Sequence, residues 1–78
     1  MKLKVGGLYS YANPRNIYSD YYGISTVGSM KTDEPFVFLE KASAELKWVI
    51  AYKILTAKGI VGWVHLGYPE YLKELFHG

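Results

Sequence analysis

The fold is decided by the stretch Gly59-Ile60-Val61-Gly62-Trp63-Val64, taken with the run Trp48-Val49-Ile50-Ala51-Tyr52-Lys53-Ile54-Leu55 that precedes it. Both segments are rich in β-branched and aromatic residues, which favour strands. Between them lies Thr56-Ala57-Lys58-Gly59, whose glycine can adopt the positive φ that a tight hairpin turn requires. The two segments therefore predict a β-hairpin on which the rest of the chain packs.

The length of the chain limits the number of domains. Its 78 residues leave room for one hydrophobic core, and 50% of them are hydrophobic, which argues against disorder. Ordering a chain costs about 1.5 kcal/mol per residue, nearly as much as apolar burial returns in so small a protein. We therefore expect residues 1–78 to form a single, compact domain with a closed architecture.

The composition excludes several classes of protein. The chain has no cysteine, so it has neither a disulfide framework nor a cysteine-based zinc site. Its apolar runs are far shorter than the ~20 residues of a membrane span. Residues 1–7 contain two lysines but no apolar stretch typical of a signal peptide, so a cytoplasmic protein is expected.

The segments around the hairpin supply further strand candidates. Residues 2–11 start with alternating polar and apolar residues, bend at two glycines and resume as a strand. Residues 23–28 form a short strand candidate after a long, tyrosine-rich loop over residues 12–22. Phe36–Glu40 predicts a strand that is apolar on both faces, as in a small barrel whose outward residues are covered by loops.

The C-terminal segment shows a different spacing. Leu72, Leu75 and Phe76 stand at helical i, i+3, i+4 intervals, which predicts a short helix or 3₁₀ turn that closes one end of a barrel. With about five short strands and glycine-marked turns, the predicted fold is an all-β, five-stranded small barrel.

Several of these segments resemble Src-homology-3 (SH3) domains, and most closely the bacterial ones. Bacterial SH3 domains commonly end in Gly-x-x-Gly-Trp-Val-x-x-x-Tyr, which is matched from Gly59 through Val64 to Tyr68. Residues 7–11, Gly-Leu-Tyr-Ser-Tyr, are similar to the Ala-Leu-Tyr-Asp-Tyr motif of the eukaryotic family. The Trp-Trp-x-Ala strand of that family is echoed by Trp48-Val49-Ile50-Ala51. The resemblance implies an SH3-like barrel.

The resemblance also implies a ligand-binding groove lined by aromatic side chains. The groove would lie between the tyrosine-rich loop and the polar loop over residues 41–47. Its expected ligand-binding residues are Tyr9, Tyr11, Asp20, Trp48, Trp63, His65 and Tyr68. Aromatic rings bury large areas at low entropic cost, which suits them to binding. The alternative is that some of these rings, Tyr11 and Tyr68 among them, fill the core.

Two departures from the family bear on the ligand. The first loop holds Arg15 and a single acid, Asp20, where eukaryotic members are acidic. The proline that usually follows the Gly-x-x-Gly strand is replaced by His65. The partner is therefore not expected to require a proline-rich motif.

Catalysis and metal binding are not expected. His65, Ser10 and Asp20 are the side-chain types of a hydrolytic site, but no spacing motif unites them. The chain has two histidines and no cysteine, so we expect no transition-metal site and no cofactor.

The sequence thus predicts a non-catalytic binding module that contacts a protein or extended peptide through the aromatic groove. A small, freestanding bacterial or phage-type adaptor or inhibitor fits this description. Nucleic-acid binding is the alternative, since small barrels with aromatics and basic charge bind single strands. Binding of cell-wall glycans, as in many bacterial SH3 domains, is the second alternative. The oligomeric state stays open, because exposed aromatics also mark homodimer interfaces.

Overall fold

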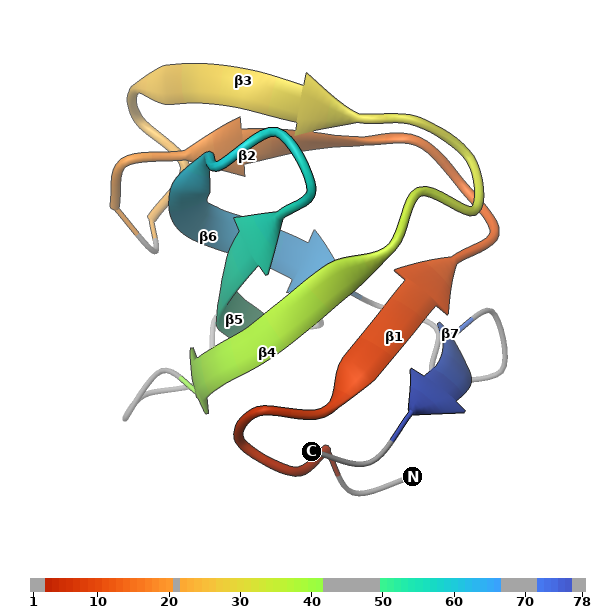
Figure 1. Cartoon of the computed structure of the whole chain (residues 1–78). Helices are drawn as coiled ribbons and strands as arrows, with labels where there is room; N and C mark the ends of the chain where they lie inside the picture. Colours follow the sequence, from red (N-terminus) through yellow and green to blue (C-terminus); the bar gives the residue numbers. More distant parts are fainter. Residues whose placement is uncertain (1–2, 21, 42–49, 67–71, 77–78) are drawn as a thin grey trace.

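A computed structural model of the protein describes residues 3–20, 22–41, 50–66 and 72–76. Within these residues the chain is all-β, and its strands form one open, antiparallel sheet (Figure 1). The order of the strands across the sheet is β3-β2-β6-β5-β4-β1-β7. The strands are β1 (Leu8–Tyr11), β2 (Arg15–Tyr18), β3 (Thr26–Met30), β4 (Phe36–Lys41), β5 (Ile50–Thr56), β6 (Val61–Leu66) and β7 (Leu72–Phe76).

The predicted central hairpin is confirmed as β5 and β6. The two strands pair in register from Ile50 opposite Leu66 to Leu55 opposite Val61. In the turn, Gly59 has a φ of 83° and its N–H donates to the carbonyl of Thr56 at 3.0 Å. The Thr56 side chain also accepts a hydrogen bond, at 3.2 Å from the N–H of Ile60. The turn therefore uses the positive φ that the sequence predicted at this glycine.

The predicted five-stranded barrel is wrong, because the described residues form seven strands in an open sheet. One additional strand is β2, which lies inside the predicted tyrosine-rich loop and pairs with β3. In β2 only Ile17 is fully buried, so its apolar pattern is too short to indicate a strand. Tertiary pairing with β3 and β6 is what makes this segment extended.

The predicted C-terminal helix is also wrong. Residues 72–76 form β7, which pairs antiparallel with β1 from Tyr11 opposite Leu72 to Leu8 opposite Phe76. A helix of this length is too short to be stable alone, whereas the edge of β1 offers backbone partners.

No helix within the described residues is long and apolar enough to cross a membrane.

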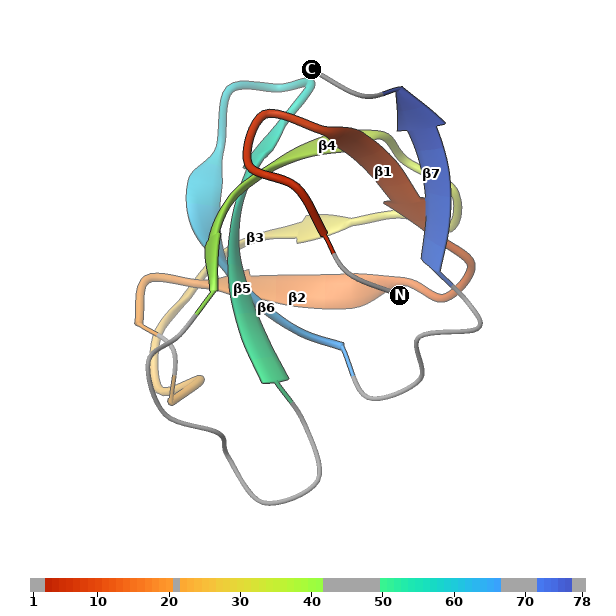
Figure 2. The ribbon, with the colours of Figure 1, turned by 90° about the horizontal axis from the view of Figure 1, so that it is seen from below.

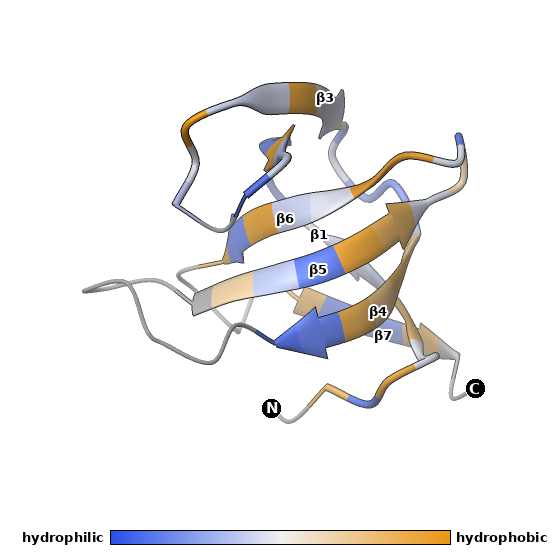
Figure 3. Cartoon of the chain, turned by 90° about the vertical axis from the view of Figure 1, so that its left-hand side faces the viewer, coloured by the Kyte–Doolittle hydropathy of each residue, from blue (hydrophilic) through white to orange (hydrophobic). Residues whose placement is uncertain are grey.

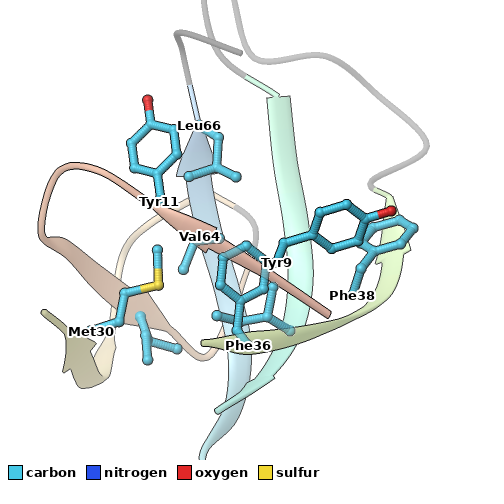
Figure 4. Close-up of a cluster of buried hydrophobic side chains, with 9 residues drawn as sticks. Tyr9, Tyr11, Met30, Phe36, Phe38, Val64 and Leu66 are labelled. Atoms are coloured by element: carbon cyan, nitrogen blue, oxygen red, sulfur yellow. The ribbon is translucent and has the colours of Figure 1, made fainter. Parts of the chain in front are cut away.

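The sheet curls around a single core. Figure 1 shows β2 and β3 lying across from β1 and β4, and Figure 2 shows the same curl from below. The core side chains come from six strands of one sheet, so one face of the sheet is turned inward. Figure 4 shows the labelled side chains of this core, with the rings of Tyr9 and Phe38 next to each other. The cluster consists of Tyr9, Tyr11, Ile17, Met30, Phe36, Phe38, Ile54, Val64 and Leu66.

The curl depends on a close approach between β2 and β6 at Gly62. A Cβ atom on Gly62 would lie 2.5 Å from Cγ2 of Ile17 and 2.7 Å from the backbone oxygen of Tyr18. Both distances are shorter than van der Waals contact, so a side chain at this position would force β2 away from β6. Glycine is therefore required here for packing.

We expect Gly62→Ala to destabilise the protein by about 1–3 kcal/mol, the usual cost of overpacking a well-packed site. The measurement is the free energy of urea unfolding. Val61→Thr, an isosteric substitution at the neighbouring, half-exposed position, is the control and should change stability by less than about 0.5 kcal/mol. Equal stability of Gly62→Ala and the wild type would contradict the close approach.

Candidate functional site

The face of the sheet opposite the core is the candidate site and is called the outer face here. Side chains alternate between the two faces of a strand, and cross-strand partners share a face. Because Phe36 and Ile54 point into the core, their neighbours Val37 and Leu55 point outward. The outer face of an antiparallel sheet is normally polar, and this one departs from that rule in two adjacent rows.

The first row is aliphatic and crosses four strands. The register pairs Leu8 with Val37, Val37 with Leu55, and Leu55 with Val61. These four residues are called the aliphatic row. Val61 is 49% exposed and the other three are partly exposed. Figure 3 shows the hydrophobic parts of β4 and β5 side by side.

A small pocket lies along the aliphatic row. Its volume is about 250 Å³, and its lining includes three members of the row together with Pro35 and Ala57. No charged residue lines it. The pocket therefore suits an apolar group.

The second row is aromatic and lies next to the first, since Trp63 stands two residues after Val61 on β6. Tyr18 on β2 is the cross-strand partner of Trp63, and Lys53 on β5 is its partner on the other side. The rings of Tyr18 and His65 stack with centroids 5.2 Å apart and an interplanar angle of 30°. We call Tyr18, Trp63 and His65 the aromatic row; all three are partly exposed.

The loop between β2 and β3 borders the aromatic row and is organised by Asp20. Its Oδ1 accepts hydrogen bonds from the N–H of Tyr22 at 2.9 Å and of Ile24 at 3.3 Å, and its Oδ2 accepts one from Ser25 at 3.4 Å. The loop comes close to the aromatic row, because a Cβ on Gly23 would lie 2.9 Å from Cε1 of His65. Asp20 therefore holds the loop beside the aromatic row.

The same bonds set the pKa of Asp20. Desolvation of the carboxyl acts to raise its pKa, but backbone N–H donors from Ile24, Ser25, Tyr22 and Gly23 outweigh it and hold the pKa below its usual value. The structure thus gives Asp20 a role in shaping the loop. That it contacts a ligand stays a prediction.

Tyr9 and Tyr11, two of the expected ligand-binding residues, lie in the core. Both are 0% exposed, because β1 lies between β4 and β7 and turns its alternate side chains inward. The hydroxyl of Tyr9 accepts a hydrogen bond from the N–H of Lys4 at 2.8 Å, which satisfies the buried phenol. The guanidinium of Arg15 lies over the Tyr11 ring, 4.9 Å from its centroid. The core alternative is therefore the one that the burial of these rings supports.

The other expected residues divide into two groups. Trp63 and His65 lie together on the outer face of β6. Trp48 and Tyr68 lie outside the described residues, as does most of the polar loop over residues 41–47 that would border the groove. Sequence reasoning missed Tyr18, which was assigned to a loop. The signal for the aliphatic row in the sequence is that Phe36–Glu40 is apolar on both faces.

The structure does not place Ser10 and His65 on neighbouring strands. Ser10 is 2% exposed on β1, which β4 and β5 separate from the strand that carries His65. Within the described part of the chain, no group of three or more histidine, cysteine or acidic residues could hold a metal ion. The two rows of the outer face offer apolar contact and ring stacking.

Comparisons of the chain with protein-family models, curated proteins and solved structures give no match. The relationship to SH3 domains therefore stays a prediction. The geometry of the outer face is the basis for inferring a function.

The bonds of Asp20 predict how its loop responds to acid. A carboxyl whose folded pKa is depressed contributes stability that is present above its unfolded pKa and is lost as pH falls through the folded pKa. We expect the amide resonances of Tyr22, Ile24 and Ser25 to shift together with a midpoint below pH 3.8, the ordinary value for the carboxyl. NMR spectra recorded across an acid titration measure this midpoint.

Asp20→Asn provides the control, because an amide does not titrate and the acid-dependent shift should vanish. A midpoint above pH 3.8 in the wild type, or an unchanged shift in Asp20→Asn, would contradict the role of these bonds.

Proposed function

We propose that this protein is a non-catalytic module that binds a partner protein, in extended form, on its outer face. The observation that carries the proposal is the pair of adjacent apolar rows on a sheet face that should be polar. Apolar side chains that neighbour one another on a surface are typical of interaction sites. The proposal places binding on the outer face instead of the expected groove, because Tyr9 and Tyr11 lie in the core.

The composition of the two rows supports a protein partner. Tyr18 and Trp63 offer rings that lose little conformational freedom on binding, and such residues are enriched among the anchors of protein interfaces. The aliphatic row gives a partner further apolar surface to bury, next to the rings. Both rows stand on strands of one sheet, so the surface is formed before the partner arrives and costs little to order.

Nucleic-acid binding is the second candidate, and one observation favours it. Lys53 lies opposite Trp63, so a cation stands beside a ring on which a base can stack. The aliphatic row has no role in such a complex, because it offers neither a ring nor a charge. For this reason the protein partner is the better-supported proposal.

The proposal predicts that Trp63→Ala weakens binding of the partner by about thirtyfold, as for a central interface anchor. The measurement is affinity capture from bacterial lysate, followed by titration of the recovered protein. Val61→Ser, in the aliphatic row, should weaken binding as well. Val5→Ser is the matched control, since Val5 is 71% exposed and belongs to neither row.

Two further measurements make the result decisive. Circular dichroism should show that every variant keeps the wild-type fold, since both substituted rows lie on the outer face. Nuclease treatment should leave capture unchanged. Capture that disappears with nuclease, or that is equally strong for Trp63→Ala and for the wild type, would overturn the proposal.

A further inference from the structure

A second pocket lies at the end of the aromatic row, and its charged residues are all basic. It has a volume of about 470 Å³ and is called the basic pocket. It is lined by Pro14, Arg15, Asn16, Tyr18, Ser29, Met30 and Lys31. Arg15 and Lys31 are its two cations, and no acidic side chain is part of its lining.

The guanidinium of Arg15 is held in place by two contacts. It lies 4.9 Å from the centroid of the buried Tyr11 ring, and its Nη1 donates to the carbonyl of Pro14 at 2.9 Å. The bond to Pro14 uses one of the five N–H donors of a guanidinium. A planar donor group fixed in this way is suited to a carboxylate or phosphate, which it can bind through two parallel hydrogen bonds.

Neutral hydrogen-bonding groups accompany the two cations. Asn16 and Ser29 are cross-strand partners on β2 and β3, and both are exposed. The carboxylate of Glu34 accepts a hydrogen bond from the backbone N–H of Lys31 at 3.1 Å and is not part of the pocket lining. The pocket lining therefore offers two cations and neutral hydrogen-bond donors but no negative charge. This combination favours an anionic ligand.

The basic pocket continues into the aromatic row, because Tyr18 belongs to both. We propose that the partner segment is an acidic peptide, with one carboxylate in the basic pocket and the adjacent residue on Tyr18 and Trp63. This inference rests on the proposed function and specifies its ligand. It agrees with the net charge of +2.

The inference is tested with defined probes at constant ionic strength. The probes are an oligo-glutamate peptide ending in tryptophan, an oligo-lysine peptide of the same length and ending, oligothymidine, and inorganic phosphate. We expect the glutamate peptide alone among the polymers to shift the amide resonances of Asn16, Ser29 and Lys31 in NMR titrations. Phosphate should shift them only at much higher concentration, because it lacks the ring that contacts Tyr18.

Three variants locate the binding site. Arg15→Gln should weaken binding of the glutamate peptide about tenfold, the effect of losing a hydrogen bond between charged groups. Lys31→Gln, at an exposed position, should weaken it about threefold. Lys58→Gln removes the same charge from the exposed β5–β6 turn and should leave the affinity unchanged.

Several outcomes would overturn the inference. One is that Lys58→Gln weakens binding of the glutamate peptide as much as Lys31→Gln does. Another is that oligothymidine shifts the same amides while the glutamate peptide does not. A third is that phosphate binds as tightly as the peptide. A glutamate peptide that produces no shift would also overturn it. If a captured partner still depends on Trp63, the proposed function survives this failure, and only the acidic character of the ligand is wrong.

Discussion

The close approach of β2 to β6 at Gly62 is the contact on which the rest of the structure depends. Because residue 62 lacks a side chain, Ile17 enters the core and the backbone of Tyr18 lies against β6. The same approach pairs Tyr18 with Trp63 across the two strands, and the Tyr18 ring stacks on His65. One packing contact therefore closes the core on one side of the sheet and brings together the aromatic row on the other.

The two faces of the sheet differ in their side chains: the inner face forms the core, and the outer face carries the proposed binding surface. Inward side chains from six strands form the core, with tyrosine and phenylalanine rings filling much of it. Tyr9 can be buried without loss of stability because its hydroxyl accepts a hydrogen bond from the N–H of Lys4. The outer face carries two further rows of aliphatic and aromatic side chains that are not part of the core. This excess apolar surface is what supports a binding function over a purely structural one.

The sequence predicted the local features well and the non-local ones poorly. The β5–β6 hairpin and β4 were recognisable because their strand-forming residues are contiguous and a glycine marks the turn. β2 and β7 were missed, since each becomes extended only by pairing with strands distant in the sequence. Spacing of Leu72, Leu75 and Phe76 fits a helix and a strand about equally well over five residues, and the open edge of β1 decided between them.

Only part of the candidate site could be read from the sequence, for the same reason. Trp63 and His65 were identified from a local motif, and both lie on the outer face. Tyr9 and Tyr11 come from a similar motif but face the core, because the curl of the sheet decides which side of β1 is enclosed. Tyr18 and the aliphatic row became visible only through cross-strand register, which no local pattern specifies.

The most direct test of the account compares two valines on β6 that lie on opposite faces. Val61 is 49% exposed on the outer face and Val64 is 0% exposed in the core. A soluble paramagnetic agent that relaxes exposed methyl groups, added to a dilute sample, should relax the Val61 methyls strongly and spare those of Val64. Equal protection of both valines would mean that the outer face is covered, which would contradict the proposed binding surface.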